Sequence, residues 1–123
     1  MIAWRDLLAV PFELGADGPE KMDCWGQARE VNRRAGRALP DLSRARPTPD
    51  DAERGMVGLL PATQPYQIGD VFMSDPEKRG HPSHVAVLVA PGWTLSCTQR
   101  HGPYAKRVGA TPCDLGVWRA PLA

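Results

Sequence analysis

The hydrophobic pattern of the chain changes at Gly69, and this change restricts the fold more than any other feature. Before Gly69 the clearest pattern is helical, with apolar residues at three- or four-residue steps. These residues are Trp25, Ala28, Val31 and Ala35. Asp23 can cap the start of such a helix, and Gly36 supplies a stop at its end. The sequence therefore predicts a helix that begins at Cys24.

Beyond Gly69, short runs of apolar and β-branched residues predict strands. We expect strands at residues 70–73, 84–90 and 93–98, with a tight turn over residues 90–93, and two shorter strands at 106–108 and 115–118. Helices followed by an antiparallel sheet form an α+β pattern.

A second short helix is expected after Thr48. Thr48 can serve as its N-cap, and Pro49 suits the first helical position. The residues expected to bury the far end of this helix are Met56, Val57, Leu59 and Leu60.

The length of 123 residues fits one compact domain, spanning residues 1–123, with one modest core. It leaves no room for a separate binding module. The 13 prolines and 12 glycines divide this domain into short elements.

The charges nearly cancel, with 15 Lys and Arg against 14 Asp and Glu. Such a chain has no overall field that would attract nucleic acid or an anionic membrane. The N-terminal segment lacks the basic start and long apolar stretch of a signal peptide, and no run is long enough to span a bilayer. We therefore expect no nucleic-acid partner, no membrane insertion, and synthesis in the cytoplasm without a signal peptide.

Cysteine usage argues against both disulfides and metal binding. The three cysteines, Cys24, Cys97 and Cys113, cannot all pair within one chain. No Cys/His cluster has the spacing of a zinc site. We expect at least one free thiol, no metal and no cofactor.

Cys24 is the best candidate for a nucleophile. The unpaired N–H groups and the dipole of a helix N-terminus lower the pKa of a nearby thiol. A base is also needed, and His84 begins the apolar strand that would pack beside this helix. If thiol and imidazole meet there, proton transfer produces the thiolate. His81 is less suitable because it lies in a polar loop.

Two segments of the chain resemble one known family. Residues 11–15 (Pro-Phe-Glu-Leu-Gly) and 22–26 (Met-Asp-Cys-Trp-Gly) are similar to the nucleophile segment of NlpC-type cysteine peptidases, especially the phage-tail members. Residues 69–72 (Gly-Asp-Val-Phe) and 84–87 (His-Val-Ala-Val) are similar to the two family strands that follow, and residues 116–119 resemble the aromatic-Arg ending of phage members. The resemblance implies a papain-like α+β fold, in which N-terminal helices pack on a C-terminal antiparallel sheet.

The resemblance also implies catalytic roles. Cys24 would be the nucleophile and His84 its base. In the family a third polar residue, often histidine, lies about twelve positions further on and orients the imidazole, and this position is Ser96 here. Gln99 and His101 are nearby alternatives. The family usually has a tyrosine at the position of Phe12, so that hydroxyl donor is absent.

The function implied by the resemblance is hydrolysis of peptidoglycan stem peptides, at a bond of the D-glutamyl to diamino acid type, by a virion-associated enzyme of a phage tail tip. Other tail-tip proteins would then be its partners. Two alternatives stay open. Phe12 and Ser96 would permit a weakly active or inactive structural tail subunit, and the same Cys–His pair could serve a CHAP-like amidase.

Overall fold

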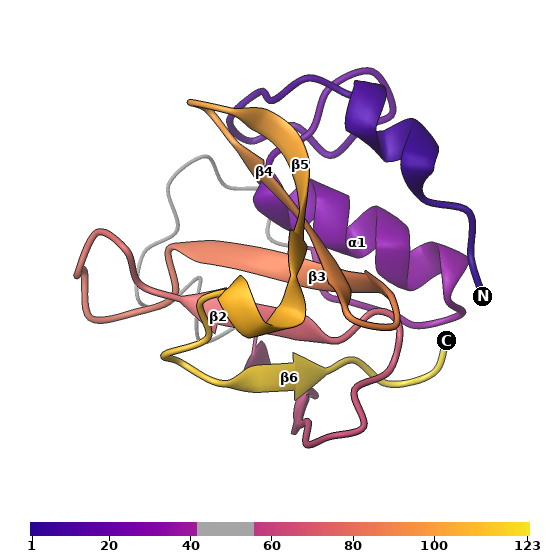
Figure 1. Cartoon of the computed structure of the whole chain (residues 1–123), viewed down its shortest axis with the longest axis vertical. Coiled ribbons are helices and arrows are strands. Elements are labelled where there is room, and N and C mark those ends of the chain that lie inside the picture. Colours follow the sequence, from indigo (N-terminus) through magenta and orange to yellow (C-terminus); the bar gives the residue numbers. More distant parts are fainter. Residues whose placement is uncertain (42–55) are drawn as a thin grey trace.

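The computed structural model describes residues 1–41 and 56–123. Over these residues a single α-helix packs against a six-stranded antiparallel sheet (Figure 1). The elements are η1 (Arg5–Ala9), α1 (Cys24–Arg34), β1 (Leu60–Pro61), β2 (Val71–Ser74), β3 (His84–Ala90), β4 (Trp93–Thr98), β5 (Gly102–Arg107), η2 (Val108–Ala110) and β6 (Val117–Arg119). The strand order is β1-β6-β2-β3-β4-β5. This arrangement confirms the predicted α+β fold class.

Helix α1 starts where its cap residue predicts. The Gly26 N–H donates to the Asp23 carboxylate at 2.8 Å, so Asp23 is the N-cap and Cys24 the first helical residue. The helix ends before Gly36, which has a φ of 75°. Ala28 and Val31 are completely buried against the sheet. The predicted helix is confirmed.

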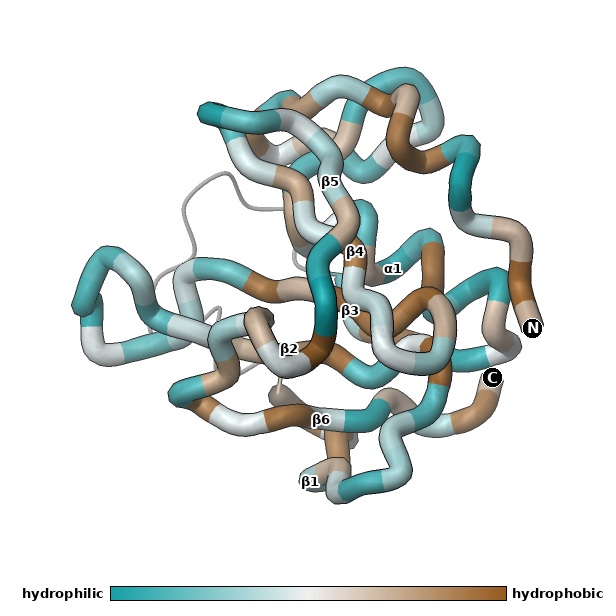
Figure 2. The backbone as a smooth tube through the Cα atoms, viewed as in Figure 1, coloured by the Kyte–Doolittle hydropathy of each residue, from teal (hydrophilic) through white to brown (hydrophobic). Residues whose placement is uncertain are grey.

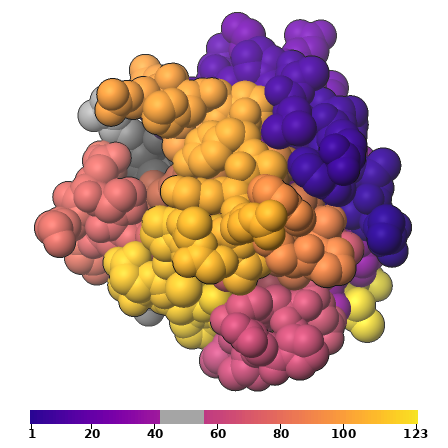
Figure 3. Space-filling model, in the orientation of Figure 1, coloured from indigo at the N-terminus to yellow at the C-terminus, as the bar shows by residue number. Residues whose placement is uncertain are grey.

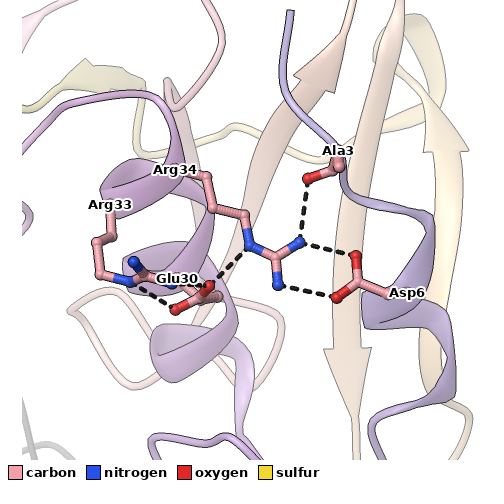
Figure 4. A network of polar contacts seen from close by, with 5 residues as sticks. All are labelled: Ala3, Asp6, Glu30, Arg33 and Arg34. Atoms are coloured by element: carbon pink, nitrogen blue, oxygen red, sulfur yellow. Dashed lines mark hydrogen bonds and ion pairs between the residues drawn. The ribbon is translucent and has the colours of Figure 1, made fainter.

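An ion-pair network joins the N-terminal segment to the last turns of α1 (Figure 4). The Arg34 guanidinium donates to both Asp6 oxygens, at 2.7 and 2.8 Å, and to the Ala3 carbonyl at 3.0 Å. It also contacts Glu30, which pairs with Arg33 as well. Each pair includes a solvent-accessible side chain, so it contributes little to stability by itself, but together the pairs join η1 to α1.

The sheet is apolar on both faces, and its side chains alternate between them. The face toward α1 carries Val71, Met73, Val85, Val87, Val89 and Leu95. The other face carries Phe72, Ala86, Leu88 and Val117, with Tyr66 and Val108 against them. Figure 2 shows the contrast between these apolar strands and the hydrophilic β2–β3 loop that projects to the left. Helix α1 therefore covers only one face.

Segments from the two halves of the chain lie side by side. Strand β5 contacts η1, and Figure 3 shows the orange β4–β5 region next to the indigo N-terminal segment. Helix α1 also contacts β3, and the start of α1 lies at the end of the sheet where β3 begins.

Several predicted boundaries need correction. Strand β5 covers residues 102–107 and not 106–108, because each of its residues pairs with one on β4. Strand β6 begins two residues later than expected, and β1 was not predicted. The turn between β3 and β4 is confirmed.

The predicted second helix lies mostly in residues 42–55, outside the described residues. Of the residues expected to bury its end, Leu59 is buried. Val57 and Leu60 are 68% and 67% exposed, so that part of the prediction is wrong. Leu60 instead begins the edge strand β1, which among the described strands pairs only with β6.

Candidate active site

A cavity of about 410 Å³ lies where the N-terminal end of α1 meets β3, β4 and β5. All three residues predicted for catalysis, Cys24, His84 and Ser96, line it. They come from three different elements, α1, β3 and β4. The fold therefore brings together side chains that are up to 72 positions apart in the sequence.

Cys24 is held at the start of α1 with its sulfur against β3. The backbone N–H of Val85, the residue that follows His84, acts to lower the pKa of this thiol, and Val85 lines the same cavity. Burial raises the pKa of the Cys24 thiol to about 12, and the nearby Asp23 carboxylate adds to the rise. The expectation of a lowered pKa is therefore wrong for the free protein, because desolvation outweighs the backbone N–H groups.

His84 begins β3, opposite Ser74 on β2, and is half-buried. Burial lowers the pKa of its imidazole, and the positive charge of Lys106 lowers it further. Both shifts favour the neutral thiol and the neutral imidazole over a thiolate–imidazolium pair.

Ser96 lies on β4, opposite Tyr104 on β5, and only 3% of it is exposed. Its backbone carbonyl accepts a hydrogen bond from the Gln27 side chain of α1 at 3.4 Å. Of the two alternatives, Gln99 also lines the cavity. His101 is exposed in the β4–β5 turn, outside the cavity lining, with its ring centroid 6.0 Å from that of Tyr104.

The N-terminal segment closes one side of the cavity with Phe12 and Leu14. Phe12 carries no hydroxyl, as the sequence indicates. Its backbone lies close to the helix start, since it forms a bridge with Met22. The N-terminal segment therefore contributes an apolar part of the cavity wall.

The three cysteines are all free: Cys24 is half-buried, Cys97 is buried and Cys113 is exposed. The Cys97 thiol also lines the cavity, and it donates to the Met22 carbonyl at 3.5 Å.

In the described portion of the chain, no group of three or more His, Cys, Asp or Glu residues could hold a metal ion. Over the same residues, no helix has the length and apolar character needed to cross a membrane.

The sequence interpretation missed several residues of the cavity. Tyr104 and Lys106 from β5 line it, as do Glu77 and Pro82 from the β2–β3 loop. The alternation of side chains along β5 could have indicated the first two, but only once the true extent of that strand was known.

The site combines a free cysteine at a helix N-terminus with a histidine at the start of a facing strand. The two residues share a cavity beside an antiparallel sheet. This arrangement defines a papain-like α+β protein. Residues 9–118 match the NlpC/P60 family, and the chain belongs to this family. Comparison with curated proteins found no significant match.

Solved structures agree with this fold. NlpC2 from Trichomonas vaginalis matches with a TM-score of 0.67 and 20% identity over 97% of this chain. A lipoprotein-like NLP/P60 family protein from Staphylococcus aureus matches with a TM-score of 0.66 and 18% identity over 96% of this chain. The chain spans only 43% and 39% of those two proteins.

The NlpC/P60 domain of the peptidoglycan hydrolase SagA matches with a TM-score of 0.60 and 18% identity over 94% of this chain. In this case the chain spans 90% of the other structure. At these identities the matches show the fold.

Proposed function

We propose that this chain is a cysteine peptidase that hydrolyses peptide bonds in the stem peptides of peptidoglycan. The observation that carries the proposal is the shared cavity of Cys24 and His84 in a member of the NlpC/P60 family. The similarity to a domain of a peptidoglycan hydrolase supports the substrate class.

In the proposed reaction the Cys24 thiol is the nucleophile and His84 is the general base. Both are neutral at rest, so His84 takes the thiol proton as the sulfur attacks the carbonyl carbon. The same proton then passes to the nitrogen of the leaving amine as the C–N bond breaks. A water molecule, deprotonated by His84, hydrolyses the resulting thioester and releases the acid.

Ser96 is the proposed positioning residue for the imidazole. It lies on β4, next to the strand that His84 begins, and lines the same cavity. A serine hydroxyl can accept a hydrogen bond from the ring, although it stabilises imidazolium less than a carboxylate does.

The oxyanion is proposed to be held by backbone N–H groups at the start of α1. Such groups point at the helix end, where Cys24 lies, and need no side-chain donor. This source of hydrogen bonds compensates for the hydroxyl that Phe12 lacks.

The proposed bond is of the D-glutamyl to diamino acid type, and the proposed setting is the tail tip of a phage. Both follow from the resemblance of residues 11–15, 22–26 and 116–119 to phage-tail NlpC-type peptidases. A second candidate is a structural tail subunit without activity. The raised pKa of the Cys24 thiol and the absence of a hydroxyl at Phe12 favour it.

Digestion of purified peptidoglycan tests the proposal. We expect wild-type protein to release muropeptides whose masses identify the cleaved bond, and Cys24→Ala to release none. Cys113→Ala is the matched control, because Cys113 is exposed and outside the cavity lining. Fragments from cleavage between sugar and peptide would indicate an amidase. Identical blank traces from folded wild-type protein and Cys24→Ala would favour the structural subunit.

A further inference from the structure

Lys106 places a positive charge in the active-site cavity. It lies on β5, opposite Thr94, and shares a strand face with Tyr104, which pairs with Ser96. The side chain is half-buried, and it lines the same cavity as Cys24 and His84. The ammonium group is close enough to lower the pKa of the His84 imidazole.

The acidic residues of the cavity have other partners. The Asp23 carboxylate accepts hydrogen bonds from the N–H groups of Gly26 and Gly15, at 2.8 and 3.0 Å, and is 8% exposed. Glu77 pairs with Arg79 in the β2–β3 loop. Within residues 1–41 and 56–123, no carboxylate forms an ion pair with Lys106. As far as the structure describes the chain, the cavity therefore contains a lysine that has no carboxylate as an ion-pair partner.

The positive charge of Lys106 opposes the proposed reaction, because the imidazole must become positive when it takes the thiol proton. An anion bound at Lys106 would offset this charge and assist the proton transfer. The substrate itself can supply that anion if it carries a free carboxylate near the scissile bond.

We propose that Lys106 binds a free carboxylate of the peptide substrate and so selects anionic peptides over the corresponding carboxamides. This inference rests on the proposed function of the same cavity. A carboxamide has nearly the same shape as a carboxylate but no charge. Comparing the carboxylate peptide with the carboxamide peptide therefore isolates the electrostatic contribution of Lys106 to substrate binding. A hydrogen bond between two charged groups in a partly desolvated site corresponds to a preference of about tenfold or more.

The test uses two synthetic stem-type peptides that differ only in whether the carboxyl groups flanking the scissile bond are free or amidated. We expect wild-type protein to cleave the free peptide with a kcat/KM about tenfold or more above that of the amidated peptide. Lys106→Met should bring this ratio close to one, and Lys106→Arg should restore part of it. Arg100→Met is the control, since it removes an exposed charge outside the cavity lining and should keep the wild-type ratio.

A binding measurement separates failure of this inference from failure of the proposed function. Calorimetry with Cys24→Ala, alone and combined with Lys106→Met, gives the affinity of both peptides without cleavage. If Cys24→Ala binds the free peptide more tightly than the amidated one, and the double variant does not, the result supports the role of Lys106. This holds even if wild-type protein cleaves neither peptide. Equal binding of the two peptides, or no binding of either, overturns it. A folded Lys106→Met protein that keeps the full preference also overturns it.

Discussion

The Cys24 thiol should be unreactive in the free protein, although it lies at a helix N-terminus. Its pKa is raised from 9.0 to about 12, so at neutral pH the thiolate fraction is about a thousandfold below that of an ordinary thiol. We expect alkylation of Cys24 by iodoacetamide to be slower than that of an unstructured cysteine peptide by a similar factor. The rate should rise about tenfold for each pH unit, without a plateau, between about pH 6 and about pH 9.

Mass spectrometry of the peptide that contains Cys24, over a time course in Cys113→Ser protein, measures this rate without interference from the exposed thiol. A rate that levels off with an apparent pKa below about 8, a value under that of an ordinary thiol, would refute the reasoning. Such a plateau would mean that the helix N-terminus and His84 outweigh burial, and that a thiolate exists before the substrate binds.

Four further changes should affect stability or titration. Arg119→Met removes the two 2.8 Å hydrogen bonds that the Arg119 guanidinium donates to the fully buried Asp70 carboxylate. The free energy of unfolding, measured in urea, should fall by about 3 kcal/mol. A fall of less than about 1 kcal/mol would contradict this expectation. Because folding lowers the pKa of His84, the unfolded chain takes up the proton more readily and stability should fall as the pH drops below about 6.5. Lys106→Met should raise the pKa of His84 and so reduce the fall of stability at low pH. An NMR titration in which the pKa of His84 does not rise would contradict the electrostatic coupling. Asp23→Ala removes the cap of α1 and should cost about 1–2 kcal/mol by thermal unfolding, whereas Asp23→Asn should retain most of the stability.

The sequence was sufficient to predict elements that depend on local signals. Helix α1 was predictable because Asp23, the spacing of apolar residues and Gly36 all act within one segment. Strand β3 was predictable from its unbroken apolar run, since both faces of the sheet are covered there.

Elements that depend on distant partners were not predictable. Strand β5 starts with Gly102 and Pro103, which disfavour strands, and it is extended there only because β4 pairs with it. Strand β1 has only two residues, one of them Pro61, and exists through its pairing with β6.

The candidate site could be predicted in its residue types but not in its electrostatics. The positions of Cys24 at a helix start and His84 at a strand start suggested these two residues, and the resemblance to NlpC-type peptidases implied Ser96. The structure places all three in one cavity. The direction of the pKa shift at Cys24 depends on how completely neighbouring segments exclude water, which no local pattern records. The presence of Lys106 in the cavity depends on the register of β4 with β5.

The measurement that tests the central claim most directly is detection of an acyl-enzyme on Cys24. Protein mixed with a stem-type peptide is quenched in acid within the first turnover, and its intact mass is recorded. We predict a mass increase equal to the acyl portion of the peptide, located on Cys24, reversed by hydroxylamine and absent from Cys24→Ala. Peptide cleavage without this adduct, or cleavage that persists in Cys24→Ala, would contradict the proposal that Cys24 is the nucleophile.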